Sequence, residues 1–155
     1  MRLILLAVGD RLPAWAEAAT AEYLKRMPRE ARVDLREIRP ENRAGRAATA
    51  IKQAEAARLL EKQPEGSRLV ALDEHGAQLS TRELADLLQR WMASGRDTCL
   101  MIGGADGLAP SILERAEATL ALSRLTLPHA LARVLLAEQL YRAASLLRNH
   151  PYHRE

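Results

Sequence analysis

LSRLTLPHALARVLLAEQLYRAASLLRNHPYHR, residues 122–154, is the stretch that decides the fold. Pro128 suits the first helical position, where a missing N–H costs nothing, and no residue from 129 to 149 breaks a helix. Apolar residues recur along it at helical spacing. A narrower polar line runs between them at spacings of three and four: Glu138, Arg142, Ser145 and Asn149. The stretch predicts a long helix that leads into a polar, functionalised tail.

Strands and helices alternate along the chain before this helix. Continuous or alternating apolar runs predict five strands, at residues 2–8, 32–39, 68–73, 98–102 and 119–122. Helical patterns fill the intervals, at residues 13–27, 43–62, 80–95 and 110–118, and Ser80 with Glu83 forms a capping-box signature. Strict alternation predicts an α/β fold: a mostly parallel five-stranded sheet with helices on both faces, in a single domain of residues 1–155.

Composition bounds the function class. The 155 residues are 48% apolar, yet they include no Phe, two Trp and three Tyr, which predicts Ala- and Leu-rich helices packed closely on the sheet. A formal net charge of +3 is too small by itself to indicate a nucleic-acid binder. Cationic side chains do gather near the C-terminus, where they either serve a partner or simply suit a solvated helix end: Arg142, Arg148, His150, His153 and Arg154.

The single cysteine, Cys99, excludes an internal disulfide and lies in the apolar run 98–102, so we expect it to be buried. A reducing cytoplasm is the natural compartment for such a chain. The apolar run Leu3–Val8 is short and no cleavage site follows it, so it predicts a strand rather than a signal peptide. No stretch approaches the length of a membrane span, and we expect a soluble, cytoplasmic protein.

Three strand ends carry unusual residues, at the edge where open parallel sheets bind ligands. They are 72–76 (LDEHG), 102–107 (IGGADG) and 122–127 (LSRLTL). The Gly-rich turn matches neither the dinucleotide fingerprint nor the phosphate-binding loop, and it also fits a plain strand-to-helix turn. Asp73 and Glu74 fit a general acid and base, or two acids of a surface turn.

The sequence contains no pattern typical of a metal site or of a hydrolase nucleophile. His150 and His153 are separated by Pro151 and have no accompanying Cys, Asp or Glu cluster. Ser123 lacks the strained G-x-S-x-G elbow of a hydrolase. The remaining expectation is group transfer from a bound small donor, without a metal.

The sequence resembles the RlmH family of the SPOUT (α/β-knot) methyltransferases, the 23S rRNA pseudouridine-1915 N3-methyltransferases. The matching blocks are LDEHG at 72–76, MIGGADGL at 101–108, LSRLTLPHALARVLLAEQLYRA at 122–143 and HPYHR at 150–154. The resemblance implies a C-terminal trefoil knot, S-adenosyl-L-methionine as donor and a homodimer with active sites built from both subunits. It implies, as substrate, a pseudouridine of 23S rRNA in the assembled ribosome.

Carried over by position, the resemblance assigns the donor contacts to two strand ends and one loop: Leu72, Gly103, Leu122, Ser123, Arg124, Leu125, Thr126 and Leu127. The imide N3 of pseudouridine must lose a proton before it attacks, and His153 is the candidate base or orienter of the nucleobase.

Three further residues complete the predicted catalytic set. Arg154 and Arg142 are expected to bind phosphate or to stabilise charge on the uracil carbonyls, and Tyr152 to stack on a base. Glu138, four residues before Arg142, is expected to orient that guanidinium; a role as the base is the lesser alternative. A disordered terminus is the alternative for the whole tail.

Other functions stay open at this point. The same fold serves RNA methyltransferases that modify tRNA or a ribose hydroxyl. A non-catalytic RNA-binding or ribosome-assembly factor would keep the pocket as scaffolding. A nucleotide-dependent oxidoreductase is disfavoured because the fingerprint is absent.

Overall fold

The computed structural model describes residues 1–154 of the chain. Five strands alternate with five helices: β1 (Leu3–Val8), α1 (Ala14–Lys25), β2 (Val33–Ile38), α2 (Ala48–Lys62), β3 (Arg68–Gln78), α3 (Thr81–Ser94), β4 (Thr98–Ile102), α4 (Pro110–Arg115), β5 (Ala118–Ala121) and α5 (His129–Leu147). Two short 3-10 turns cover Arg29–Ala31 and Pro151–Arg154.

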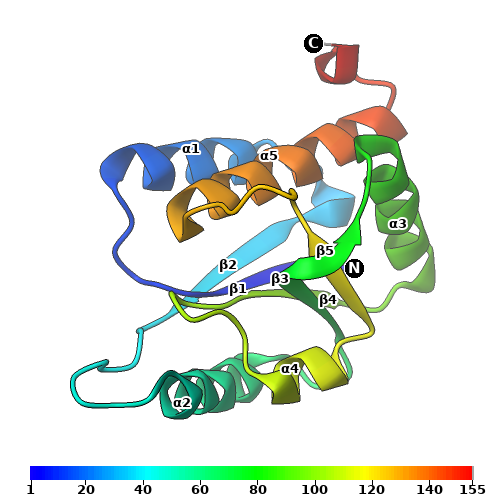
Figure 1. Ribbon diagram of the computed structural model, residues 1–155. Helices are drawn as coiled ribbons and strands as arrows, with labels where there is room; N and C mark the ends of the chain where they lie inside the picture. Colours follow the sequence, from blue (N-terminus) through cyan, green and yellow to red (C-terminus); the bar gives the residue numbers. More distant parts are fainter. Residues whose placement is uncertain (155) are drawn as a thin grey trace.

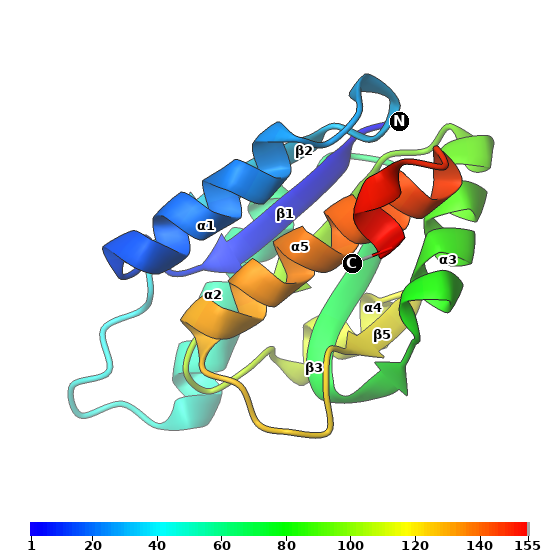
Figure 2. The ribbon, with the colours of Figure 1, turned by 90° about the horizontal axis from the view of Figure 1, so that it is seen from above.

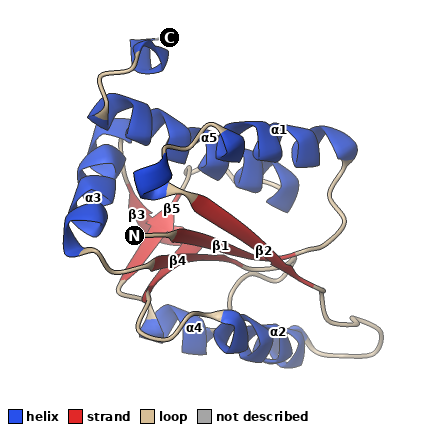
Figure 3. Cartoon of the chain, turned by 180° about the vertical axis from the view of Figure 1, so that it is seen from behind, coloured by secondary structure: helices blue, strands red, loops and turns tan. Residues whose placement is uncertain are grey.

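The strands form one sheet in the order β2-β1-β4-β3-β5, and every neighbouring pair is parallel. Helices α1, α3 and α5 cover one face, and α2 and α4 cover the other (Figures 1 and 3). The predicted parallel α/β architecture is therefore confirmed, and β2 is an edge strand as its alternating sequence indicated. The trefoil knot that the resemblance implies stays a prediction.

The continuous apolar runs follow from this layering, because side chains alternate between the faces of a strand. In β1, Leu3, Leu5 and Ala7 belong to the core beneath α1, α3 and α5, whereas Ile4, Leu6 and Val8 belong to the core above α2 and α4. All six are at most 2% exposed. Helix α1 lies beside α5 across the first face (Figure 2).

Cys99 is fully buried in the core above α2 and α4, as predicted. Burial raises the pKa of its thiol to about 12, so the reactive thiolate is negligible near neutral pH. Cys99 therefore has a packing role.

Helix α3 matches its predicted capping signals. The Ser80 hydroxyl accepts a hydrogen bond from the Glu83 N–H at 3.2 Å, and the Glu83 carboxylate accepts one from the Ser80 N–H at 2.7 Å. Gly95 then ends the helix with a left-handed φ of 67°.

Several predicted helix boundaries are wrong. Helix α2 begins at Ala48 rather than 43, because Gly45 has a φ of 66° and the loop before the helix is held by ion pairs from Glu41 to Arg46 and Arg58. Helix α4 ends at Arg115. Pro128 is the residue before the first turn of α5, with an extended ψ of 151°, rather than its first helical residue.

Strand β3 is longer than predicted, since it continues past Asp73 to Gln78. It pairs with β5 twice, through Leu72 and again through Ala77, and the residues between them form a bulge. Gly76 makes this possible: a Cβ there would lie 2.7 Å from the backbone of Leu120. The sequence LDEHG is thus a strand irregularity, and the exposed Glu74 and His75 are carried on it.

None of the helices within residues 1–154 has the length and apolar character that crossing a membrane requires.

Candidate active site

The predicted donor-binding residues gather where β4 and β5 end, beside Leu72 in the middle of β3. Leu72 is paired with Ile102 of β4 and with Leu120 of β5. Gly103 follows Ile102 directly, and the 122–127 loop follows the end of β5 at Ala121. The three motifs that lie far apart in the sequence therefore meet at one edge of the sheet, where parallel sheets hold ligands.

The turn after β4 closes tightly on itself. The Gly107 N–H donates to the Gly104 carbonyl at 3.0 Å, and Gly107 has a φ of 82°. A Cβ on Gly103 would lie 2.4 Å from the Gly107 carbonyl carbon, a distance that real Cβ atoms do not show. Gly103 is therefore required by the close approach of its own loop, which the sequence alone did not reveal.

Arg43 and Glu55 contact this turn from the α2 side. Asp106 forms an ion pair with Arg43, which lies on the loop before α2, and its hydrogen bond with Arg43 lowers the pKa of the Asp106 carboxyl. Glu55 of α2 is 4% exposed and accepts a hydrogen bond from the Glu41 N–H at 3.1 Å. Its second oxygen lies 3.1 Å from the place that a Cβ of Gly104 would occupy. Helix α2 and its loop thus brace the Gly-rich turn.

The 122–127 loop runs from β5 back to the first turn of α5 (Figure 2). The Ser123 hydroxyl accepts a hydrogen bond from the Leu125 N–H at 2.9 Å, which fixes a turn in the loop. Leu125 is 75% exposed, an unusual state for a large apolar side chain. The loop thereby offers apolar surface beside the strand ends.

Sequence reasoning missed two residues at the start of α5. Arg133 is 1% exposed, and it donates to the Glu37 carboxylate at 2.6 Å and to the Gly9 carbonyl at 2.9 Å. The same guanidinium is 3.0 Å from His129 Nε2, and His129 Nδ1 is 2.9 Å from the Gly103 carbonyl. The available signal was a polar pair four residues apart on an otherwise apolar helix face, PHALAR, at 128–133.

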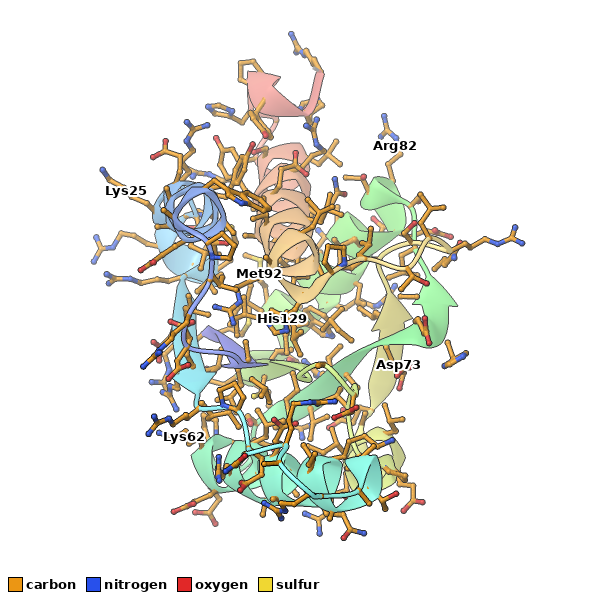
Figure 4. All side chains as sticks on the ribbon, turned by 60° about the vertical axis from the view of Figure 1, so that its left-hand side comes forward. Lys25, Lys62, Asp73, Arg82, Met92 and His129 are labelled. Carbon is orange, nitrogen blue, oxygen red and sulfur yellow. The ribbon has the colours of Figure 1, made fainter. Side chains whose placement is uncertain are left out.

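Chemistry fixes the protonation of His129. A guanidinium has only donors, so Nε2 must accept from Arg133, and the ring proton must lie on Nδ1, where it donates to Gly103. Burial and the charge of Arg133 lower the pKa of His129, against weaker opposing effects of Gly103 and Glu37. Figure 4 shows His129 between α5 and the strands below. The imidazole is held neutral.

The neutral state of His129 predicts a pH-dependent stability. Its pKa is about 6.5 in an unfolded chain and lower in the folded protein, so the unfolded state binds the proton first. Stability is therefore complete above about pH 6.5 and falls as the pH drops towards the folded pKa, with a limiting slope of about 1.4 kcal/mol per pH unit. Urea unfolding of the wild type and His129→Asn from pH 8 to 5 measures this; an unchanged difference between the two at all pH values contradicts it.

The C-terminal tail packs on the far end of α5. The ring centroids of Tyr152 and Tyr141 lie 4.6 Å apart. The Arg142 guanidinium lies 4.8 Å from the centroid of the Tyr152 ring. The Tyr152 hydroxyl donates to Glu138 Oε1 at 3.1 Å. Burial and hydrogen bonds with Tyr23 and Glu138 raise the pKa of Tyr152, which stays a neutral phenol. Tyr152 anchors the tail here; its stacking on a base stays a prediction.

Glu138 orients Arg142, as the spacing predicted. Its Oε1 accepts from Arg142 Nε at 2.8 Å and from Nη2 at 2.7 Å. His153 and Arg154 complete the 3-10 turn, with Arg154 exposed. His153 Nδ1 is buried and has no acceptor or donor within residues 1–154. A catalytic role stays a prediction for each of the four residues of the predicted set: Arg142, Tyr152, His153 and Arg154.

The predicted donor loops lie at the start of α5, whereas the tail packs on its second half. Gly103 contacts His129, the first residue of α5, and Tyr152 of the tail contacts Glu138 and Tyr141. Glu138 is nine residues beyond His129, which is about 14 Å along the helix axis at about 1.5 Å per residue. Figure 2 shows the loop before α5 at the N-terminal end of this helix and the C-terminal turn folded back over its second half. The expectation that the segment from residue 122 to the tail serves both donor and acceptor, in sites built from two subunits, stays a prediction.

Two hollows lie away from the donor loops. One, of about 90 Å³, lies between the C-terminal ends of α1 and α5 and is lined partly by Arg26, Arg148 and His150. The other, of about 410 Å³, lies along α3 and reaches Leu120 of β5. Within residues 1–154, no group of three or more His, Cys, Asp or Glu side chains is placed to hold a metal.

Comparisons with known proteins agree with this geometry. The family model described as predicted SPOUT methyltransferase matches residues 1–153. The chain is 56% identical to "Ribosomal RNA large subunit methyltransferase H" of Ralstonia nicotianae over 99% of both proteins, and 51% identical to the protein of that name from Methylobacillus flagellatus over all of both. A probable methyltransferase from Bordetella pertussis has the same fold, with a TM-score of 0.57 at 18% identity over 92% of this chain and 95% of its own.

The parallel sheet with helices on both faces is that of an α/β protein, and the relatives found make it a methyltransferase. The chain belongs to the SPOUT methyltransferases and, within them, to the RlmH family.

Proposed function

We propose that this protein transfers a methyl group from S-adenosyl-L-methionine to N3 of pseudouridine 1915 in the 23S rRNA of the assembled ribosome. One observation carries the proposal. Over the whole chain, relatives named large-subunit rRNA methyltransferases share half or more of its residues, and its matching motifs converge on one sheet edge. The proposed substrate places the protein in the cytoplasm.

The donor fits the edge formed by Leu72, Gly103 and the 122–127 loop. Gly103 is buried against the Gly107 backbone there, while Leu72 and Leu122 are half-buried and Leu125 is exposed. Backbone groups suit the hydrogen-bonding edge of an adenine, and these apolar side chains suit its faces. When bound, the sulfonium supplies an activated methyl group, so the protein's own task is to position two reactants and manage one proton.

The acceptor is proposed to meet the tail of the partner subunit. Tyr152 of the tail contacts Glu138, about 14 Å along α5 from His129 and the Gly103 turn, so we infer that a site that uses both turn and tail takes them from two copies. An antiparallel pairing of α5 helices brings one tail to the other donor edge. Trp15 of α1 and Leu131 of α5 are 56% and 37% exposed, and a homodimer interface would bury them.

The tail then supplies the polar groups that the nucleobase needs. His153 is proposed to accept the N3 proton or to orient the ring, and Arg154 and Arg142 to bind phosphate or the uracil carbonyls. Arg142 is already positioned by Glu138, as its 2.8 Å hydrogen bond indicates. Tyr152 keeps the tail folded and presents its ring beside Arg142.

The proposal is tested by methylation of ribosomes that contain or lack pseudouridine, with the product located by mass spectrometry. We expect methyl incorporation at N3 of the pseudouridine and none in ribosomes that carry uridine there. With a net charge of +3, the protein should methylate a naked hairpin poorly. Methylation of tRNA or of a ribose hydroxyl would assign a different target. A failure to bind S-adenosylmethionine in calorimetry would favour a non-catalytic RNA-binding role.

A further inference from the structure

We propose that His129 is a positioning residue that sets the geometry of the donor-binding turn through the carbonyl of Gly103, and that Arg133 holds it in the tautomer this requires. The inference rests on the proposed function for its ligand, S-adenosylmethionine. It adds residues that lie on a buried helix face rather than in the binding loops.

The first step is the direction of the hydrogen bonds. His129 Nδ1 is 2.9 Å from the Gly103 carbonyl, and Nε2 is 3.0 Å from Arg133 Nη2. Because Arg133 has no acceptor to offer, the only arrangement that satisfies both contacts places the proton on Nδ1. One carbonyl of the donor-binding turn is therefore held by a single, oriented N–H.

The second step is what anchors the guanidinium. Arg133 is 1% exposed, and its contacts reach the Glu37 carboxylate on β2 and the Gly9 carbonyl just after β1. A charge buried this deeply persists when it is paired and hydrogen-bonded, so its position is well determined. The strand ends of β1 and β2 are thereby connected, through Arg133 and His129, to the turn after β4.

The third step is why this turn needs an external hold. Its own closing bond is the 3.0 Å contact from the Gly107 N–H to the Gly104 carbonyl, which leaves Gly103 defined mainly by close packing. Arg43 holds the turn from the α2 side through its ion pair with Asp106, and Glu55 packs against Gly104 there. His129 holds it from the opposite face of the sheet, so the turn is fixed between two layers before any ligand arrives.

Two isosteric variants separate the two hydrogen bonds. The side-chain amide nitrogen of Asn overlays imidazole Nδ1, so His129→Asn keeps the donor to Gly103. The amide group of Gln reaches the position of Nε2, where its oxygen accepts from Arg133. His129→Gln therefore keeps the contact with Arg133 and loses the donor to Gly103. We expect His129→Gln to weaken S-adenosylmethionine binding by about 10-fold and His129→Asn to stay within about threefold of the wild type.

Calorimetry with S-adenosylmethionine is paired with hydrogen exchange of the amides of residues 104–108 in the free protein, and with thermal unfolding to confirm that both variants fold. Faster exchange in His129→Gln than in His129→Asn supports the proposal without any ligand. Equal donor affinity and equal exchange in the two variants overturn it. A wild type that binds no S-adenosylmethionine, with exchange still differing between the variants, overturns the proposed function and leaves the positioning role standing.

Discussion

Co-expression of two inactive variants is expected to restore methylation to about a quarter of the wild-type level, because each active site is proposed to take its parts from two subunits. One variant is Gly103→Leu, whose side chain would overlap the Gly107 backbone and disrupt the proposed donor turn. The other lacks Tyr152–Glu155 and so has no tail to offer an acceptor. In a heterodimer, the intact turn of the second variant meets the intact tail of the first, and one of the two sites is complete.

The expected number of complete sites distinguishes a shared site from a site within one chain. At equal expression, half of the dimers are heterodimers and each has one complete site, which gives about a quarter of all sites. If turn and tail instead served the same chain's site, no complete site would exist and activity would stay at zero. The placement of the tail argues against that alternative, since Tyr152 contacts Glu138 about 14 Å along α5 from His129 and the Gly103 turn.

A matched control uses the same two defects in one chain. When this doubly altered chain is co-expressed with wild type, heterodimers contain no complete site, and activity again falls to about a quarter. Sites built within one chain would give about a half. Methyl incorporation into ribosomes measures both mixtures, and gel filtration confirms that each variant remains dimeric. Zero activity for the first mixture together with a half for the second would refute the shared site.

Gly103→Ala by itself is expected to weaken S-adenosylmethionine binding by at least about 10-fold, since overpacking a closed site costs about 1–3 kcal/mol. The added Cβ would lie 2.4 Å from the carbonyl carbon and 2.6 Å from the oxygen of Gly107, both backbone atoms that cannot move without opening the turn. Isothermal titration calorimetry on the purified variant measures the loss.

The matched control for this substitution is Gly104→Ala, one residue further along the same turn. Its Cβ would meet the Glu55 carboxylate and the Val8 methyl group at 3.1 Å, and side-chain ends move by a few tenths of an ångström at small cost. We expect affinity within about fivefold of the wild type. Equal affinity losses in the two variants would contradict this prediction, because they would show that the turn tolerates no added atom at either glycine.

Much of the fold was predictable because its signals are local. The alternation of strands and helices, the capping box at Ser80 and the edge character of β2 all depend on residues close in sequence. The errors in the predicted boundaries fall where contacts with distant segments determine the structure. Strand β3 continues beyond Asp73 because β5 offers it a second pairing, which no property of residues 73–78 announces.

The candidate site likewise contains residues that the sequence predicted and residues that only the structure revealed. The motif residues at the three strand ends were identified before the structure, and their meeting at one edge follows from the parallel sheet. His129 and Arg133 were missed because an amphipathic pattern treats a polar pair on a helix as a solvated face. Arg133 is instead buried against β1 and β2, more than 90 residues away in sequence.

By itself the sequence determined the class of fold, the Glu138–Arg142 pair and the family, and it predicted the residues of the donor loops. These conclusions depend on periodicity, short-range spacing and motif identity, which can be read from the order of residues alone. Only the tertiary structure decided that Gly103 is closed in by Gly107, that His129 is neutral and bonded to the turn, and that the tail packs on the second half of α5. The physical reason is that close contact, burial and separation depend on which segments pack together, and packing is a property of the folded chain.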